Sequence, residues 1–150
     1  MPKQPKIPGA NAGYSGTPLP KKLGIRENSR VILLNSPERF ERELEPMPDG
    51  AEIVGNASLA NVAILFVRSE ADLVRDFRAL AKSLPQKVAF WTAWPKQASG
   101  IRTDLKEGLI REFGLAHGWV DYKICAIDET WSGLRFVVRV ADRPKMASRP

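Results

Sequence analysis

Short apolar runs alternate along the chain with segments whose apolar residues recur every three or four positions. The longest apolar run, residues 62–67, is typical of a strand that is covered on both faces. Across residues 73–84 the spacing is that of a helix, with Ser69 placed to cap its first turn and Pro85 to end it. The same criteria predict strands at 31–34, 51–54, 61–67, 88–94, 119–127 and 134–140.

Shorter helices are predicted from their boundary residues. Thr17 as an N-cap and Gly24 as a stop predict one helical turn before the first strand. A short helix follows that strand. A longer one is predicted to begin at Thr103 or Asp104 and to stop at Gly114, because glycine commonly follows the last turn of a helix.

The order of these elements is strand, helix, strand, strand, helix, strand, helix, strand, strand. Continuous apolar strands with helices between them indicate a mostly parallel sheet with helices on both faces. Only about six residues separate 119–127 from 134–140, which is too few for a helical crossover. We therefore predict an α/β fold that ends in an antiparallel hairpin.

The length of 150 residues suits one domain. Residues 1–13 are rich in proline and glycine and are predicted to be a flexible basic arm, residues 14–143 the domain, and residues 144–150 a flexible tail. No apolar run approaches the roughly 18 residues of a membrane span, and the first residues lack the apolar centre of a signal peptide. A soluble cytoplasmic protein without a membrane partner is expected. With Cys125 and His117 as the sole cysteine and histidine, no metal site is expected.

The net charge of +6 belongs to the two ends of the chain. Residues 1–30 hold six basic residues and one acidic residue, and residues 141–150 hold three and one. The body between them, residues 31–140, holds 14 basic and 15 acidic residues. Binding to nucleic acid requires several cations presented together. We therefore do not expect a dedicated nucleic-acid function, and we expect any weak binding to act through the tails.

Several short segments of the chain have a distinctive sequence. They are Gly13 to Leu19, Lys21 to Ile25, Trp94 to Lys96, Ser99 to Gly100, Thr103 to Leu105 and Cys125 to Phe136. Together they resemble a family of small bacterial proteins grouped as a domain of unknown function, and the resemblance extends over about residues 13–143. The order of strands also resembles the C-terminal half of a class I methyltransferase, which implies a Rossmann-like fold but carries no activity with it.

The chain departs from the methyltransferase pattern where the cofactor would bind. Such enzymes place a glycine-rich turn after the first strand and an acidic residue after the second. Here the first turn, residues 35–40, has no glycine, and the second strand runs into Gly55 and Asn56 without an acid. No phosphate-binding loop occurs elsewhere. We expect no classical nucleotide cofactor, and binding of S-adenosylmethionine or nicotinamide dinucleotides no tighter than millimolar.

Ligands of open parallel sheets bind beyond the carboxyl ends of the strands. If the first strand of the hairpin runs parallel to the others, four loops of this chain should converge there. They offer cations, carboxylates, hydroxyls and indoles, which suit a small anionic ligand with a planar or apolar part. The candidate ligand-binding residues are Asn35, Ser36, Arg68, Trp94, Lys96, Asp128, Glu129, Thr130 and Trp131.

Each candidate also has a structural interpretation. Lys96 is expected to face Asp128 or Glu129, either across a ligand cleft or as a latch between the hairpin and the sheet. Trp94 and Trp131 serve as stacking surfaces or as core residues. No catalytic residue is identified at this stage.

Three functions follow from these alternatives. The first is a ligand-binding or regulatory Rossmann-like module for a small anion. The second is an enzyme of transferase or hydrolase type that uses the polar cluster at the carboxyl edge. The third is a nucleic-acid-associated accessory protein that acts through its basic tails.

Overall fold

The computed structural model describes residues 17–138, which form a six-stranded sheet in the order β2-β1-β3-β4-β6-β5. The strands β2, β1, β3 and β4 are mutually parallel, while β6 is antiparallel to both β4 and β5. β5 therefore points in the same direction as the first four strands, and the predicted α/β fold is confirmed. The strands are β1 (Arg30–Leu34), β2 (Glu52–Ile53), β3 (Val62–Phe66), β4 (Ala89–Pro95), β5 (Trp119–Ala126) and β6 (Trp131–Val138).

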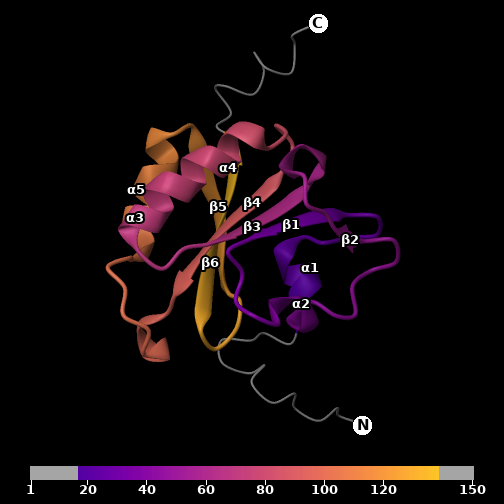
Figure 1. Ribbon diagram of the computed structural model, residues 1–150, viewed down its shortest axis with the longest axis horizontal. Coiled ribbons are helices and arrows are strands. Elements are labelled where there is room, and N and C mark those ends of the chain that lie inside the picture. The colour runs from indigo at the N-terminus through magenta and orange to yellow at the C-terminus, as the bar shows by residue number, and fades with distance from the viewer. Residues whose placement is uncertain (1–16, 139–150) are drawn as a thin grey trace, which may run out of the picture.

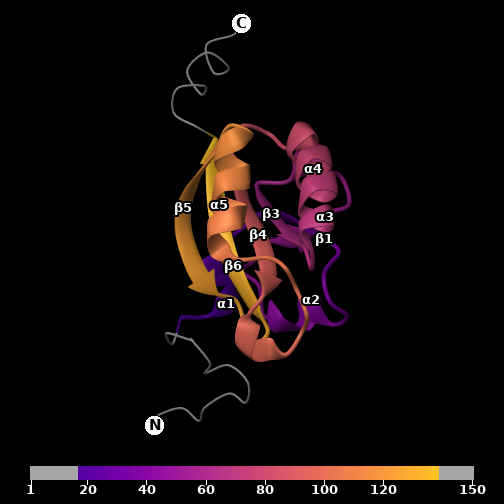
Figure 2. The ribbon, with the colours of Figure 1, turned by 90° about the vertical axis from the view of Figure 1, so that its left-hand side faces the viewer.

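Helices cover both faces of the sheet (Figures 1 and 2). One face carries two short helices, α1 (Leu19–Leu23) and α2 (Phe40–Glu43). The other carries α5 (Glu107–Ala116) and one continuous helix made of α3 (Glu70–Asp72), the π-helical turn η2 (Leu73–Phe77) and α4 (Arg78–Ser83). The 3-10 turns η1 (Ala57–Leu59) and η3 (Gln97–Ser99) lie in the loops before β3 and after β4.

Strand alternation divides the core into two layers. In β3, which is buried along its whole length, Ile64 and Phe66 join the layer beneath α1 and α2, while Leu65 joins the layer beneath α3, α4 and α5. Phe77 lies at the centre of the second layer, with its ring centroid 4.8 Å from that of Phe90 and 5.6 Å from that of Phe136. Such aromatic packing supplies much of the buried area that holds the helices on the sheet.

The helix predicted from residue 103 or 104 begins later, at Glu107, because both candidate caps are engaged elsewhere. The Asp104 carboxylate accepts the Glu70 N–H at 2.8 Å and so caps α3, while Thr103 Oγ1 accepts the Leu105 N–H. The predicted stop at Gly114 is also wrong. Gly114 lies inside α5, and a Cβ there would overlap the Phe136 ring. Close approach of helix to strand, rather than helix termination, explains this glycine.

Two other predicted boundaries differ from the structure. Pro18, not Thr17, is the N-cap of α1, although Gly24 ends the helix as predicted, with φ of +87°. The second strand of the hairpin begins at Trp131 rather than at 134, because the connection between the strands is a tight turn closed by Ile127 N–H to Trp131 O at 2.9 Å. The predicted flexible segments 1–13 and 144–150 lie outside the described residues.

No helix between residues 17 and 138 has the length and apolar composition needed to cross a membrane. Within the same range, no group of three or more His, Cys, Asp and Glu side chains is arranged to hold a metal ion.

Candidate functional site

The carboxyl ends of β1, β3, β4 and β5 lie at one edge of the sheet, together with the start of β6. The Lys96 N–H donates to the Thr130 carbonyl at 2.8 Å, and Pro95 is in register with Trp131. The predicted proximity of the turn after β4 and the turn before β6 is therefore confirmed. Antiparallel pairing of β6 with β4 brings these distant segments together.

Asp128 organises the turn before β6. Its Oδ1 accepts the backbone N–H groups of Thr130 and Trp131, both at 2.8 Å. The Asp128 carboxyl group also lies close enough to that of Glu43 in α2 to raise the pKa of Glu43. Two neighbouring carboxyl groups favour a state in which one of them keeps its proton. We call Glu43 and Asp128 the acid pair.

Glu43 is the member of the acid pair that holds the proton. As a residue it is exposed, but its carboxyl end is partly shielded. That shielding, then the hydrogen bond to Asp128 and the Asp128 charge, raise the pKa of Glu43 from 4.5 to about 8. A carboxyl group that is protonated near neutral pH can act as a general acid.

The raised pKa predicts that stability falls as pH rises. Folded Glu43 keeps its proton up to a pKa of about 8, while in the unfolded chain it loses it near 4.5, so folding is favoured at low pH. Allowing for solvent screening of this exposed residue, we expect the free energy of unfolding to drop by about 1–2 kcal/mol between pH 5 and 8. Urea denaturation across this range measures the drop.

Two variants of α2 test this interpretation. Glu43→Gln keeps a hydrogen-bond donor toward Asp128 but cannot titrate, so its stability should be nearly flat over the same pH range. Glu41→Gln removes an exposed carboxylate from the same helix and should keep the wild-type slope. An unchanged slope in Glu43→Gln would contradict the proposed proton on Glu43.

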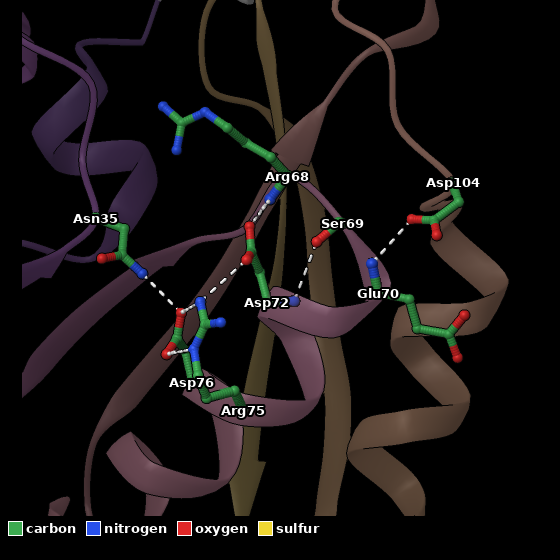
Figure 3. Close-up of polar contacts among 8 residues, drawn as sticks. All are labelled: Asn35, Arg68, Ser69, Glu70, Asp72, Arg75, Asp76 and Asp104. Carbon is green, nitrogen blue, oxygen red and sulfur yellow. Dashed lines mark hydrogen bonds and ion pairs between the residues drawn. The ribbon is translucent and has the colours of Figure 1, made fainter.

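Arg68 lies directly after β3, at the same edge of the sheet as the acid pair. Its guanidinium carbon is 5.0 Å from the centroid of the Trp131 ring, and that ring packs edge-on against Phe66. Figure 3 shows the Arg68 side chain extending away from Asp72 and Arg75. Among residues 17–138 no carboxylate lies within 4.0 Å of its guanidinium. Arg68 is thus an exposed cation, stacked on a buried indole and available to an anion.

A second polar network surrounds the start of α3 (Figure 3). Ser69 Oγ accepts the Asp72 N–H at 3.1 Å, as predicted, and Asp72 Oδ2 accepts the Arg68 N–H. Asn35 Nδ2 donates to Asp76 Oδ2 at 2.9 Å, and Arg75 pairs with both Asp72 and Asp76. These contacts fix the backbone from which the Arg68 side chain projects.

We call Arg68, Trp131 and the acid pair the cluster. Not every predicted site residue joins it. Trp94 is buried under α3, α4 and α5, whereas Trp131 is buried on the opposite face, so the two indoles do not line one cleft. Lys96 makes no ion pair within residues 17–138, so an ion-paired latch with Asp128 or Glu129 is not formed. Asp128 is instead bound by the backbone of its own turn. That Lys96 faces these carboxylates across a cleft stays a prediction.

The remaining candidates lie around the cluster. Asn35 is exposed and is tied to Asp76, and Ser36 follows it in the loop after β1. Glu129 is exposed at the tip of the turn, and Thr130 contributes its backbone groups.

The cysteine and the histidine of the chain have structural surroundings. Burial raises the pKa of the Cys125 thiol, an effect that the charges of Lys22 and Lys123 partly offset. His117 ends α5, with Nδ1 2.8 Å from the Phe113 carbonyl oxygen. A thiol with a raised pKa is a poor nucleophile.

Glu43 is the residue of the cluster that sequence reasoning missed. It lies in a four-residue helix between Phe40 and Leu44, and no local motif distinguishes it from the other charged residues there. Its partner is 85 positions further along the chain. Only the packing of α2 against the hairpin brings the two together.

Comparison with solved structures identifies the fold. The tRNA m1A22 methyltransferase TrmK of B. subtilis superposes on 88% of this chain and 70% of its own, with a TM-score of 0.52 and 10% sequence identity. The chain has a methyltransferase-like Rossmann fold. An uncharacterised protein of Listeria monocytogenes matches with 12% identity and a TM-score of 0.45, over 81% of this chain and 66% of its own. No protein-family model and no curated protein matches the sequence.

The methyltransferase fold suggests S-adenosylmethionine, but the residues present do not fit it. In the turn after β1, Asn35 and Arg39 have φ of 61° and 71°, the backbone region that glycine adopts most easily, and both carry side chains that restrict close approach. After β2, Asn56 caps the turn η1 by accepting the Ser58 N–H at 3.0 Å, and no carboxylate stands there to hold a ribose.

Proposed function

We propose that the chain is an enzyme of transferase or hydrolase type whose active site is the cluster of Arg68, Trp131 and the acid pair at the carboxyl edge of the sheet. The observation that carries this proposal is the position of Arg68. Within residues 17–138 it is a cation without an ion pair, and it lies on the face of Trp131, whose N–H binds the Asp128 carboxylate beside Glu43. Its substrate is a small anion with a planar or apolar part.

Each group in the cluster has a chemical task. The Arg68 guanidinium binds a carboxylate or phosphate of the substrate, because its planar set of donors matches both. Glu43 gives its proton to the leaving oxygen or nitrogen as the bond from that atom to the transferred group breaks. The attacking water, or the hydroxyl of an acceptor, forms the new bond and gives its proton back to Glu43. Asp128, held by the backbone N–H groups of Thr130 and Trp131, positions Glu43 and stabilises the proton on Glu43. No step involves S-adenosylmethionine.

The likeness to TrmK supports the place of this site rather than its chemistry. Ligands of open parallel sheets bind at the carboxyl edge, which here holds Arg68 and the acid pair. The mismatch at the turn after β1 favours a reaction that needs no nucleotide cofactor. A protein that only binds its ligand does not need a protonated carboxyl group at the site, so the proton on Glu43 favours catalysis.

A ligand screen tests the proposal. We expect nucleoside monophosphates, sugar phosphates or acyl carboxylates to include at least one compound that raises the melting temperature of the full chain and binds measurably by calorimetry. Arg68→Ala should weaken that compound at least tenfold. The variant should leave stability within about 1 kcal/mol of wild type, because exposed cation–π contacts contribute little.

Two further variants decide the outcome. Arg78→Ala removes an exposed arginine from α4, on the other face of the sheet, and should bind like wild type. For a compound that is turned over, Glu43→Gln should lower kcat with little change in Kd. Absence of any ligand from the panel, or full affinity in Arg68→Ala, would refute the proposed site.

A further inference from the structure

A groove of about 440 Å³ lies at the amino edge of the sheet, opposite the site proposed above. β6 runs antiparallel to β4, so its second half lies beside the amino end of β4, at the edge of the sheet where β1 and β3 also begin. We call this groove the basic groove. Its lining includes Arg26, Ser29, Asn61, Lys87, Arg135 and Val137.

The charged side chains of the basic groove are all cationic. Arg26 follows α1, Lys87 precedes β4, and Arg135 lies on β6, so three separate segments contribute them. Within residues 17–138 none of the three forms an ion pair, and no carboxylate lines the groove. Neighbouring cations that lack counterions repel one another and favour a bound anion.

One hydrogen-bond donor of Arg135 is unsatisfied. Its Nε is buried and has no hydrogen-bond partner among residues 17–138, a costly state for a charged donor. Its guanidinium carbon lies 4.8 Å from the centroid of the Tyr122 ring, and Tyr122 is 64% exposed. On β5 Lys123 is in register with Arg135 and adds a further cation to this part of the sheet. An aromatic face thus adjoins the basic groove in open solvent.

The balanced charge of residues 31–140 conceals Lys87 and Arg135, while Arg26 belongs to the basic first 30 residues. The acidic residues Glu43, Asp72, Asp76 and Asp128 gather at the carboxyl edge, far from β6's second half. At the amino edge, Glu52 lies on the β2 side, with its Oε2 4.0 Å from Arg30 Nε. Asp121 of β5 is in register with Phe136 of β6, but its carboxylate is paired with Arg111 and does not line the groove. The lining therefore has an excess of cations that the sum over the sequence does not predict.

We propose that the basic groove and Tyr122 bind single-stranded nucleic acid, with Arg26, Lys87 and Arg135 on the phosphates and Tyr122 stacked on a base. Cationic grooves flanked by exposed aromatic rings are how proteins hold single strands without reading sequence. A duplex would not offer a base face to Tyr122. The proposal places nucleic-acid binding on the folded domain rather than on the tails, and it is independent of the proposed enzyme activity.

Fluorescence anisotropy with a labelled 12-nucleotide uridine RNA tests the proposal on the full chain. The double variant Arg26→Ala with Lys87→Ala should weaken binding at least tenfold at 50 mM salt. It should also reduce the slope of log affinity against log salt by about 1.4, since each phosphate contact on a single strand contributes about 0.7. Tyr122→Ala should weaken binding about 5- to 100-fold, whereas Tyr122→Phe should bind like wild type.

A charge-matched control separates the groove from net charge. Arg78→Ala with Lys82→Ala also removes one arginine and one lysine, both exposed on α4, and should bind like wild type. An equal loss in both double variants would overturn the proposal. So would unchanged binding in the groove variant, competition by poly-glutamate as strong as that by RNA, or equal affinity for a duplex.

Discussion

Replacing Asp128 with alanine is expected to lower the free energy of unfolding by about 2 kcal/mol, because the turn before β6 loses its organising acceptor. Asp128 Oδ1 accepts two backbone N–H groups, and the same carboxyl group binds Glu43. Asp128→Asn retains an oxygen for the two N–H groups and should cost less than about 1 kcal/mol. Urea denaturation at pH 6 measures both losses.

The asparagine variant also separates the turn from the acid pair. It removes the negative charge and the carboxyl partner that help to raise the pKa of Glu43. The decline of stability between pH 5 and 8 should therefore shrink in Asp128→Asn, although the turn is preserved. Equal losses of stability in the alanine and asparagine variants would show that charge, rather than turn geometry, is what Asp128 provides.

Gly114→Ala is expected to destabilise the protein by about 1–3 kcal/mol, although alanine is the better helix former. The new Cβ would overlap the Phe136 ring, so either that ring or α5 must move. Phe136 is fully buried and packs against Phe77, which leaves it little room. Thermal and urea unfolding measure the loss.

Another glycine in α5 provides the matched control. Gly108 has nothing within 4 Å of the position of its missing Cβ, so Gly108→Ala should stabilise the helix by about 0.5–1 kcal/mol. The two substitutions should thus change stability in opposite directions. A stabilising effect of Gly114→Ala would mean that α5 lies far enough from β6 for a Cβ to fit beside the Phe136 ring.

The sequence predicts the sheet well because its strands are short buried runs bounded by polar turns. β3 and β4 are buried along their whole length, so hydrophobicity alone identifies them. The errors occur where a residue is used by a distant partner. Asp104 is a residue type that commonly caps a helix and is placed to cap α5, but it caps α3. Gly114 is a residue type that commonly ends a helix, but here it makes room for Phe136.

The candidate site is predictable only in part. Topology places the turns holding Arg68, Lys96 and Asp128 at one edge, and the structure places them there. Which side chains interact depends on the geometry of short loops, which periodicity does not specify. Glu43, rather than Lys96, reaches Asp128, and the basic groove collects cations from three segments that look unremarkable in sequence.

The position of β6 has a consequence for how the protein is made. β6 follows β5 in the chain but lies between β4 and β5, and among the described strands β5 pairs with β6 alone. While the ribosome is still synthesising residues 131–138, the apolar strand β4 has an open edge and β5 has no place in the sheet. The nascent chain must therefore carry an exposed strand edge until β6 has been synthesised, and during this interval association with other chains competes with folding.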